Sequence, residues 1–397
     1  MTTFRKSFTQ QEALPDSAIA AATKILESGR LHRYNHENGE PGEVDLLEAE
    51  FAEYLGVPYC LACASGGYAL QVAMLASGVA TGDKVLCNAF TLAPVPGAIQ
   101  RVGASPVFVD VADDYCIDLD HLAQKAADSG SKFLMLSHMR GHIADMDRIM
   151  QIAAEYSITV IEDCAHTMGA SWNGRKSGTF GDVACFSTQT YKHMNSGEGG
   201  LLATSDPEII ARAVLLSGSY MLYGRHLAIP SKEIFNSMRY EVPNVSGRMD
   251  NLRAAILRPQ LAKLKEQCRR WNERYRIVEG ILKECPRISL PARPDSEKFV
   301  GSSIQFSLPD FEVENFLEVI DNCQERGVVL SWFGDTVPRG YTSRYDSWRY
   351  LTDLPRLPKT ERVLSSMLDM RIPLTFTLDD CKLIGSIIVD VVESCEL

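Results

Sequence analysis

Lys192 lies in a setting that is unusual for a lysine. The segment FSTQTYKHMNSGEGG, residues 186–200, places it after a strand-like stretch and hydroxyl-rich residues and before a glycine-rich turn. Most lysines are solvated surface residues, so the residue type alone indicates little. A lysine held in a pocket of this kind loses its proton readily and forms a Schiff base with a carbonyl group. Lys192 is therefore the first candidate for covalent chemistry.

A glycine turn, Ser65-Gly66-Gly67, separates a strand-like segment from a helix-like one. Glycines let backbone amides face outward, and the N-terminus of the next helix adds the positive end of its dipole. Together these features make a phosphate cradle, although an ordinary tight turn explains the segment equally well. No GxGxxG motif follows this strand, so a dinucleotide-binding fold has little support.

Asp163 and His166 follow an apolar strand pattern, at the strand end where open α/β sheets place their ligands. Acids in such a place are often only helix caps. An aspartate there can also keep a heterocyclic nitrogen protonated, with His166 reaching the same ligand. A phosphate cradle, a carboxylate for a ring nitrogen and a lysine for an aldehyde fit one ligand, pyridoxal 5′-phosphate (PLP).

The elements that must position these residues alternate between strand and helix patterns from residue 58 onward. Such alternation predicts βαβ units in a large, mostly parallel sheet covered on both faces. Two further strand-like stretches follow closely, so the chain can reverse direction there. The expected strands are 59–65, 84–88, 106–111, 133–139, 158–164, 182–188 and 199–205, and the helices between the first five are 68–78, 92–103, 117–127 and 144–156.

The character of the chain changes near residue 250. A long amphipathic helical stretch, 251–285, precedes an α+β pattern that ends in a helix at 383–395. Pro259 marks a possible kink in the long stretch. We therefore expect two domains, residues 1–250 and 251–397.

Composition narrows the class of protein. The 397 residues carry a net charge of −11 and are 45% hydrophobic, which is ordinary for a globular chain. The acidic balance argues against nucleic acid and against a basic membrane surface. The chain has no leader pattern and no apolar run of the ~18 residues that a membrane span needs, and its eleven cysteines are odd in number. We expect a cytoplasmic protein with reduced thiols.

Metal binding is not expected. Cys60 and Cys63 form a C-x-x-C motif with no second pair. His138 and His142 are four residues apart, but they flank Gly141 at a strand end instead of sharing a helix face.

The ordered series of motifs resembles the DegT/DnrJ/EryC1/StrS family of sugar aminotransferases, which have the aspartate-aminotransferase fold (fold type I). The resemblance covers nearly the whole chain. It includes LEAEFAEYLGV, GASPVFVDV, VIEDCAHTMGA, GTFGDVACFST and SGEGGLLAT, and it continues through RMDNLRAAILRPQL and MRIPLTFTLDD. It implies a PLP-dependent transaminase whose large domain precedes a smaller C-terminal one.

The resemblance also implies roles for single residues. Lys192 occupies the Schiff-base position, and Asp163 matches the aspartate that pairs with the pyridine nitrogen. His166 stands near the PLP hydroxyl, and Ser187 matches a serine that contacts the phosphate. Ser65, Gly66 and Gly67 replace the family's Ser-Gly-Thr.

Two departures from the family pattern concern cofactor contacts. Leu92 stands where the family has a ring that stacks on PLP, with Phe90 two residues earlier. Ser246 replaces an asparagine that reaches the phosphate from the neighbouring subunit. The resemblance thus implies a homodimer with shared active sites.

By the same resemblance, glutamate or glutamine donates the amino group and a keto or aldehyde sugar or a cyclitol accepts it, with ping-pong kinetics. Substrate contacts are expected from the loop residues Arg33 and Tyr34, from His193, and from Tyr220 and Trp332. For the loop with Arg33 and Tyr34 a solvated connector is the simpler interpretation, and Tyr220 and Trp332 are about as well explained by packing. Two alternatives stay open: a PLP-dependent sugar dehydratase, whose family members carry His at the lysine position, and a PLP-binding regulator without turnover.

Overall fold

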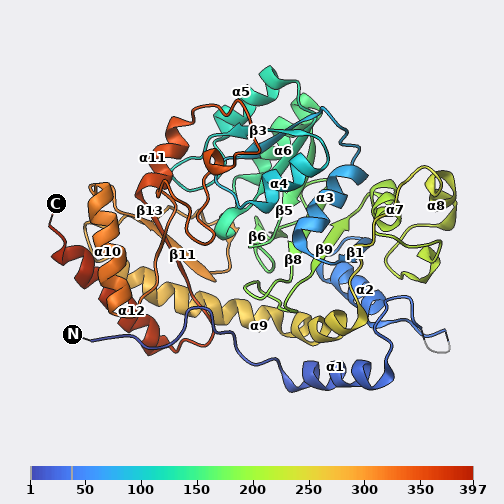
Figure 1. Ribbon diagram of the computed structural model, residues 1–397, viewed down its shortest axis with the longest axis horizontal. Coiled ribbons are helices and arrows are strands. Elements are labelled where there is room, and N and C mark those ends of the chain that lie inside the picture. Colours follow the sequence, from blue (N-terminus) through green and yellow to red (C-terminus); the bar gives the residue numbers. More distant parts are fainter. Residues whose placement is uncertain (1, 37–38, 397) are drawn as a thin grey trace.

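A central sheet organises the computed structural model, which describes residues 2–36 and 39–396 (Figure 1). Within these residues the sheet has seven strands in the order β1-β9-β8-β5-β4-β2-β3. All run parallel except β9, which pairs antiparallel with both of its neighbours. The strands are β1 (Tyr59–Cys63), β2 (Lys84–Asn88), β3 (Ser105–Val109), β4 (Phe133–Ser137), β5 (Thr159–Asp163), β8 (Val183–Ser187) and β9 (Gly200–Thr204).

Helices cover both faces of this sheet because alternate strand residues point to opposite sides. Leu61 and Cys63 pack against one helical layer, whereas Cys60 and Ala62 pack against the other. The first layer contains α3 (Gly66–Ala76), α4 (Pro94–Arg101), α7 (Pro207–Leu216) and α8 (Lys232–Met238). The second contains α2 (Glu43–Leu55), α5 (Leu119–Ser129), α6 (Met146–Tyr156) and the first half of α9 (Asn251–Leu282).

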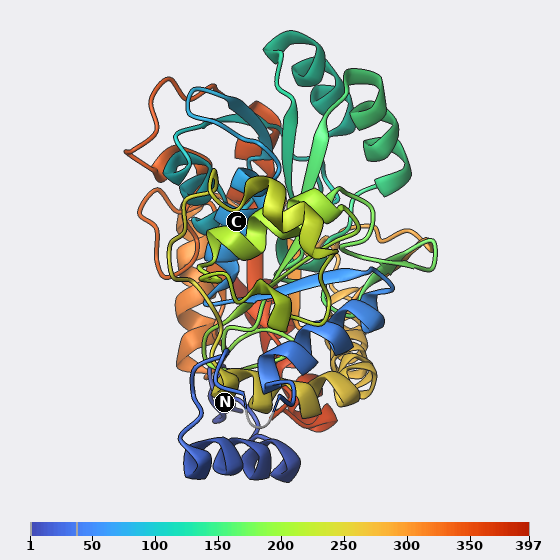
Figure 2. The ribbon, with the colours of Figure 1, turned by 90° about the vertical axis from the view of Figure 1, so that its right-hand side faces the viewer.

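A second, smaller core forms around the other half of α9. Its antiparallel sheet has the order β11-β13-β12 and packs against α10 (Val313–Glu325) and α12 (Leu378–Ser394). Figures 1 and 2 show α1 (Asp16–Ser28) lying along α9 at one end of the molecule. The remaining strands and α-helix of the described residues are β6 (Ser171–Trp172), β7 (Arg175–Lys176), β10 (Glu297–Lys298), β11 (Ser303–Ser307), β12 (Ser331–Trp332), β13 (Met367–Arg371) and α11 (Pro358–Ser366).

The expected parallel sheet with a late reversal of direction is confirmed. The helix α9 is continuous through Pro259, so its 32 residues extend about 48 Å. This helix packs against α1 and α2 at one end and against α12 at the other. The division into domains at residue 250 stays a prediction, because α9 belongs to both cores. None of the helices in the described part of the chain combines the length and apolarity needed to cross a membrane.

Candidate active site

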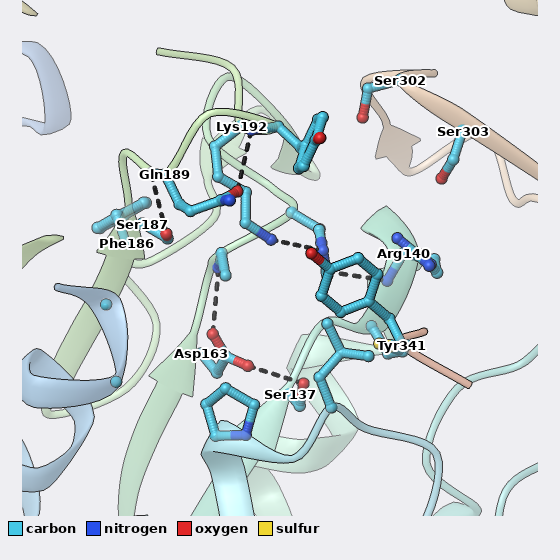
Figure 3. Close-up of a pocket in the computed structure, with 18 of the residues that line it drawn as sticks. Ser137, Arg140, Asp163, Phe186, Ser187, Gln189, Lys192, Ser302, Ser303 and Tyr341 are labelled. Atoms are coloured by element: carbon cyan, nitrogen blue, oxygen red, sulfur yellow. Dashed lines mark hydrogen bonds between the residues drawn. The ribbon is translucent and has the colours of Figure 1, made fainter. Parts of the chain in front are cut away.

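A cavity of about 570 Å³ opens at the carboxyl ends of β4, β5 and β8, where the sheet meets the smaller core. Figure 3 shows side chains from both parts of the molecule converging on it. The sequence-predicted residues that line it are Ser65, Gly66, Gly67, Leu92, Asp163, His166, Ser187 and Lys192. The fold therefore brings together residues that are up to 127 positions apart in the sequence.

The Lys192 amine points into the cavity and lies 2.7 Å from Nε2 of His166. Burial and the nearby charge of Arg140 lower the pKa of Lys192 from 10.5 to about 7, and Asp163 opposes this shift only in part. No carboxylate within ion-pair distance holds the proton on this amine among the residues that the structure describes. Near neutral pH a large fraction of Lys192 is therefore the free amine, the form that attacks a carbonyl group.

Hydrogen bonds to His166 indicate the same protonation state. The backbone N–H of Arg140 donates to Nδ1 of His166 at 3.2 Å, so this nitrogen carries no proton. Burial and the Lys192 charge lower the pKa of His166 well below its usual range, which keeps the ring neutral. The remaining proton is then on Nε2, which donates to Lys192, and only a neutral amine can accept it.

The Asp163 carboxylate is held at both oxygens at the end of β5. The hydroxyl of Ser137 donates to Oδ2 at 2.9 Å, and the Ala165 N–H donates to Oδ1 at 3.2 Å (Figure 3). The preceding residue, Glu162, points to the opposite side of the strand and accepts N–H bonds from Phe180 and Gly181 at 2.8 and 2.7 Å. Strand alternation thus leaves Asp163 as the acid that faces the cavity.

The glycine turn begins α3 and faces Ser187 across a very close contact. The Ser65 hydroxyl caps α3 by accepting from the Tyr68 N–H at 3.1 Å. A Cβ atom on Gly66 would lie 2.9 Å from Cβ of Ser187, so only glycine fits there. The first amides of a helix have no intrahelical acceptor, and they meet the Ser187 hydroxyl at the cavity wall. This is the arrangement that an anionic group such as phosphate requires.

Leu92 lines the cavity, whereas Phe90 does not. The Phe90 ring is 1% exposed and packs edge-on against Phe333 at 5.1 Å. The residue at the expected stacking position therefore supplies an aliphatic contact, and the nearby ring belongs to the core.

Arg33 and Tyr34, predicted to contact substrate, lie outside the cavity of their own chain. The Arg33 guanidinium is fully buried and pairs with Glu48 at 2.7 Å and Asp45 at 2.9 Å. The Tyr34 hydroxyl lies 2.8 Å from Nε2 of His226. These contacts are those of a buried structural cluster. Residues 37–38 of the same loop lie outside the described residues.

His193 and Trp332 are likewise absent from the cavity wall. The His193 ring lies behind Lys192, between the Met168 carbonyl at 2.7 Å and the Ser302 hydroxyl at 3.0 Å. Burial lowers the pKa of His193 to about 4. Trp332 stacks on Phe316 in the smaller core and donates from Nε1 to the Ser365 carbonyl at 2.8 Å. Both residues thus have packing roles in this chain.

Ser246 and Tyr220 lie together on the surface, away from their own chain's cavity. Their hydroxyl groups are 3.1 Å apart, and the Arg248 guanidinium lies 4.9 Å from the centre of the Tyr220 ring.

Other cavity residues escaped sequence reasoning. Two arginines, Arg140 and Arg371, line the wall together with Tyr341, Ser302 and Ser303. Arg140 stands in the SHMRGH segment, whose two histidines were considered only as a possible metal pair. Those histidines do not meet, because His138 contacts Glu162 at 3.1 Å and His142 contacts Gln305 at 2.8 Å. The sequence signal that could have identified Arg140 is a charged residue directly after a predicted strand.

The family assignment follows from comparison with known proteins. A model of the DegT/DnrJ/EryC1/StrS aminotransferase family matches residues 14–389. The chain belongs to this family. Aminotransferases of the family depend on PLP.

Curated relatives include GDP-perosamine synthase of Caulobacter vibrioides, which is 35% identical over 55% of this chain and 56% of its own length. The dTDP-3-amino-3,4,6-trideoxy-α-D-glucose transaminase of Streptomyces venezuelae is 29% identical over 90% of this chain and 91% of its own length. The alignment with the first of these spans only a little over half of the relative. Among solved structures, 3-amino-5-hydroxybenzoic acid synthase superposes with a TM-score of 0.81 at 26% identity, over 97% of this chain and 99% of that one. These similarities confirm the fold type.

The residues present fit PLP. The glycine turn, which a Cβ atom would block, can hold the phosphate beside Ser187. Asp163, fixed at both oxygens, can face a protonated ring nitrogen, and the amine of Lys192 can take the aldehyde.

Proposed function

We propose that this protein is a PLP-dependent aminotransferase that moves an amino group from glutamate or glutamine to a keto or aldehyde sugar or a cyclitol, in ping-pong fashion. The observation that carries the proposal is the Lys192 amine, which faces a cavity while hydrogen bonds and burial keep it neutral. The relatives that resemble the chain over most of its length support the acceptor class.

When bound, PLP takes the amino group from the donor and stores electrons in its ring during proton transfer. The chain's own residues supply the rest. Lys192 holds the cofactor aldehyde and then serves as the base that moves a proton at the substrate carbon. Asp163 keeps the ring nitrogen protonated, and Ser137 fixes the orientation of Asp163. His166 donates toward Lys192 and so keeps the amine from rotating away from the cavity.

A half-reaction experiment tests this proposal. Purified protein is loaded with PLP, treated with glutamate or glutamine, and followed by the absorbance of the cofactor. Wild-type protein and a Lys382→Ala control, which alters an exposed lysine, should both convert the cofactor to its amine form. Lys192→Ala should lose turnover by about 10⁴-fold or more. A Lys192→Ala variant that still turns over, or a wild-type protein that never takes up PLP, would refute the proposal.

The acceptor is identified in the reverse direction. Protein carrying pyridoxamine phosphate is mixed with a panel of keto-sugars and keto-cyclitols, and return of the PLP absorbance reports a substrate. A dehydrated sugar released without amine transfer would favour a dehydratase instead, although Lys192 argues for transamination.

A regulatory role is the second candidate. A curated relative from Geobacillus stearothermophilus is described as a pleiotropic regulatory protein and is 33% identical over 68% of each chain. Bound PLP that no amino donor converts would favour that role.

We further propose that two copies form a dimer and that Ser246 contacts the phosphate in the partner's cavity. Support comes from the exposed position of Ser246 beside Tyr220 and outside its own cavity. Mixed dimers of Lys192→Ala and Ser246→Trp should regain activity, since one of their two sites is intact. Mixed dimers that remain inactive would contradict the shared site.

A further inference from the structure

We propose that Arg140 and Arg371 form a binding site for a substrate carboxylate, on the side of the cavity away from the phosphate cradle. This inference rests on the proposed function and narrows its substrate class. A transaminase of sugars needs no such pair of cations for a neutral acceptor, so the pair indicates an acidic ligand.

The position of Arg140 separates it from the phosphate cradle. In Figure 3, Ser187 and Gln189 lie on one side of Lys192, whereas Arg140, Ser302 and Ser303 lie on the other. The backbone of Arg140 is bonded to His166, whose other ring nitrogen contacts Lys192. An anion at Arg140 would therefore lie close to the carbon that reacts.

The Arg140 side chain is fixed by an ion pair but does not use all of its hydrogen-bond donors. Its guanidinium pairs with Asp369 at 2.9 Å, while its Nε–H is buried without a partner among the described residues. Its backbone has a φ of 54°, which is costly for a residue with a side chain. Strain of this kind concentrates at functional sites, and here it aims a cation at the cavity.

Arg371 comes from the smaller sheet and lines the same cavity as Arg140. It stands two residues after Asp369 on β13, and residues at that spacing share a face of a strand. Ser303, its pairing partner on β11, also lines the cavity. The carboxylate that pairs with Arg140 thus comes from the same strand, and the same face of it, as Arg371.

Aromatic rings position Arg371 without neutralising it. Its guanidinium lies 4.0 Å from the centre of the Tyr191 ring and 5.1 Å from that of Tyr341. Within residues 2–36 and 39–396, no carboxylate lies at ion-pair distance from it. A planar guanidinium held in this way is suited to bidentate binding of a carboxylate.

The charge balance of the cavity favours an anion. The arginines Arg140 and Arg371 both lower the pKa of Lys192. Asp163 is the one half-buried acid on the wall in the described chain, and the cofactor ring nitrogen takes its charge in the proposed function. Glu198, the other acid there, is exposed to solvent. Asp369 already pairs with Arg140, so Arg371 is the cation for which an incoming carboxylate would supply the counter-charge.

Two substrates can supply that carboxylate, the amino donor or an acidic keto-sugar acceptor, since both enter the same cavity. The acceptor is examined by measuring equilibrium binding to protein loaded with pyridoxamine phosphate. The two probes are D-glucuronate and D-glucose, which differ in one carboxylate. Glucuronate should bind at least about tenfold more tightly than glucose. Arg371→Gln should abolish the difference, Arg371→Lys should restore part of it, and Arg269→Gln, at an exposed position on α9, should keep it.

The donor is examined by the half-reaction of PLP-loaded protein with glutamate. A KM for glutamate raised about tenfold in Arg371→Gln, with unchanged sugar selectivity, would assign the carboxylate to the donor. Arg371 is the preferred position because Arg140→Gln would leave Asp369 unpaired in the core.

The proposal is wrong if Arg371→Gln changes neither glucuronate binding nor the KM for glutamate. It is also wrong if the variant loses affinity only for uridine diphosphate, because the arginines would then hold a nucleotide. Binding of the sugar probes needs no turnover. An inactive protein that still selects glucuronate would therefore refute the transaminase and keep the carboxylate site.

Discussion

Two buried cationic side chains of this molecule, Lys192 and Arg33, have neighbours that shift their pKa values in opposite directions. Arg33 is paired with Asp45 and Glu48. Burial disfavours its charge, but Glu48, Tyr34 and Asp45 together outweigh burial and raise the pKa of Arg33. Lys192 has a neutral histidine as its neighbour and two arginines nearby, and its pKa falls to about 7. The first arrangement fixes a charge for the fold, whereas the second removes a charge for chemistry. Charge type alone therefore does not reveal which buried cation is functional.

The largest expected effect on stability comes from removing the paired cation. Arg33→Met leaves Asp45 and Glu48 buried without their counter-charge, so the free energy of unfolding should fall by about 3–5 kcal/mol. Urea denaturation of this variant and of Arg269→Met, in which an exposed arginine is lost, measures the difference. A loss below about 1 kcal/mol would mean that Arg33 is not structural and would return it to the list of substrate contacts.

Removing Lys192, the cation without a carboxylate partner among the described residues, should instead increase the stability of the folded protein. The unfolded chain keeps the Lys192 proton up to about pH 10.5, whereas the folded, cofactor-free protein releases it near pH 7. Wild-type stability should therefore rise between pH 7 and 10.5, and the penalty is complete below pH 7. Lys192→Met should therefore be more stable than wild type at pH 6, by about 3 kcal/mol. This figure is smaller than the full pKa shift would give, because the Lys192 side chain is only partly buried and solvent in the cavity screens its charge.

Thermal or urea unfolding between pH 6 and pH 10 tests whether Lys192→Met raises or lowers the stability. The gain from Lys192→Met should shrink toward pH 10, and Lys382→Met should show no such trend. A variant that is less stable than wild type at pH 6 would contradict the neutral amine.

Acid should weaken the Arg33 cluster. Burial disfavours the Glu48 carboxylate, but the charges and hydrogen bonds of Arg33 and His226 together outweigh burial and lower the pKa of Glu48 from 4.5 to about 2. The stability that this group contributes is complete above pH 4.5 and is lost as pH falls toward 2, about 3 kcal/mol in all. In Glu48→Gln this part of the acid dependence should disappear, while the exposed-site control Glu314→Gln should keep it. Equal slopes in both variants would be inconsistent with the pairing.

The smallest effect concerns the positioning of Asp163. Ser137→Ala removes one hydrogen bond to its carboxylate, so kcat/KM should fall about tenfold without a change in fold. Ser237→Ala, which alters an exposed hydroxyl on α8, serves as the control in the same kinetic assay. Unchanged kinetics in Ser137→Ala would show that the remaining contact to the Ala165 N–H is sufficient.

The same contrast explains what the sequence predicted well. Lys192, Asp163 and the glycine turn stand next to strands whose apolar patterns are unambiguous, so their meeting at one sheet edge could be expected. Arg33 and Trp332 were harder, because a loop arginine and a turn tryptophan look alike whether they face a ligand or a core. Arg371 was missed for another reason: β13 pairs with β11 across more than 60 residues, and no local pattern shows which residues that pairing exposes.

The unbroken α9 has a practical consequence for engineering. One continuous helix belongs to both cores, and Trp271 on it forms part of the cavity wall. The cavity residues of the large sheet and those of the paired strands β11 and β13 are thereby joined through one continuous helix. The segment from Gly340 to Ser343 also borders the cavity but lies outside every helix and strand. Libraries that vary this short stretch would sample new selectivities while the catalytic framework stays intact.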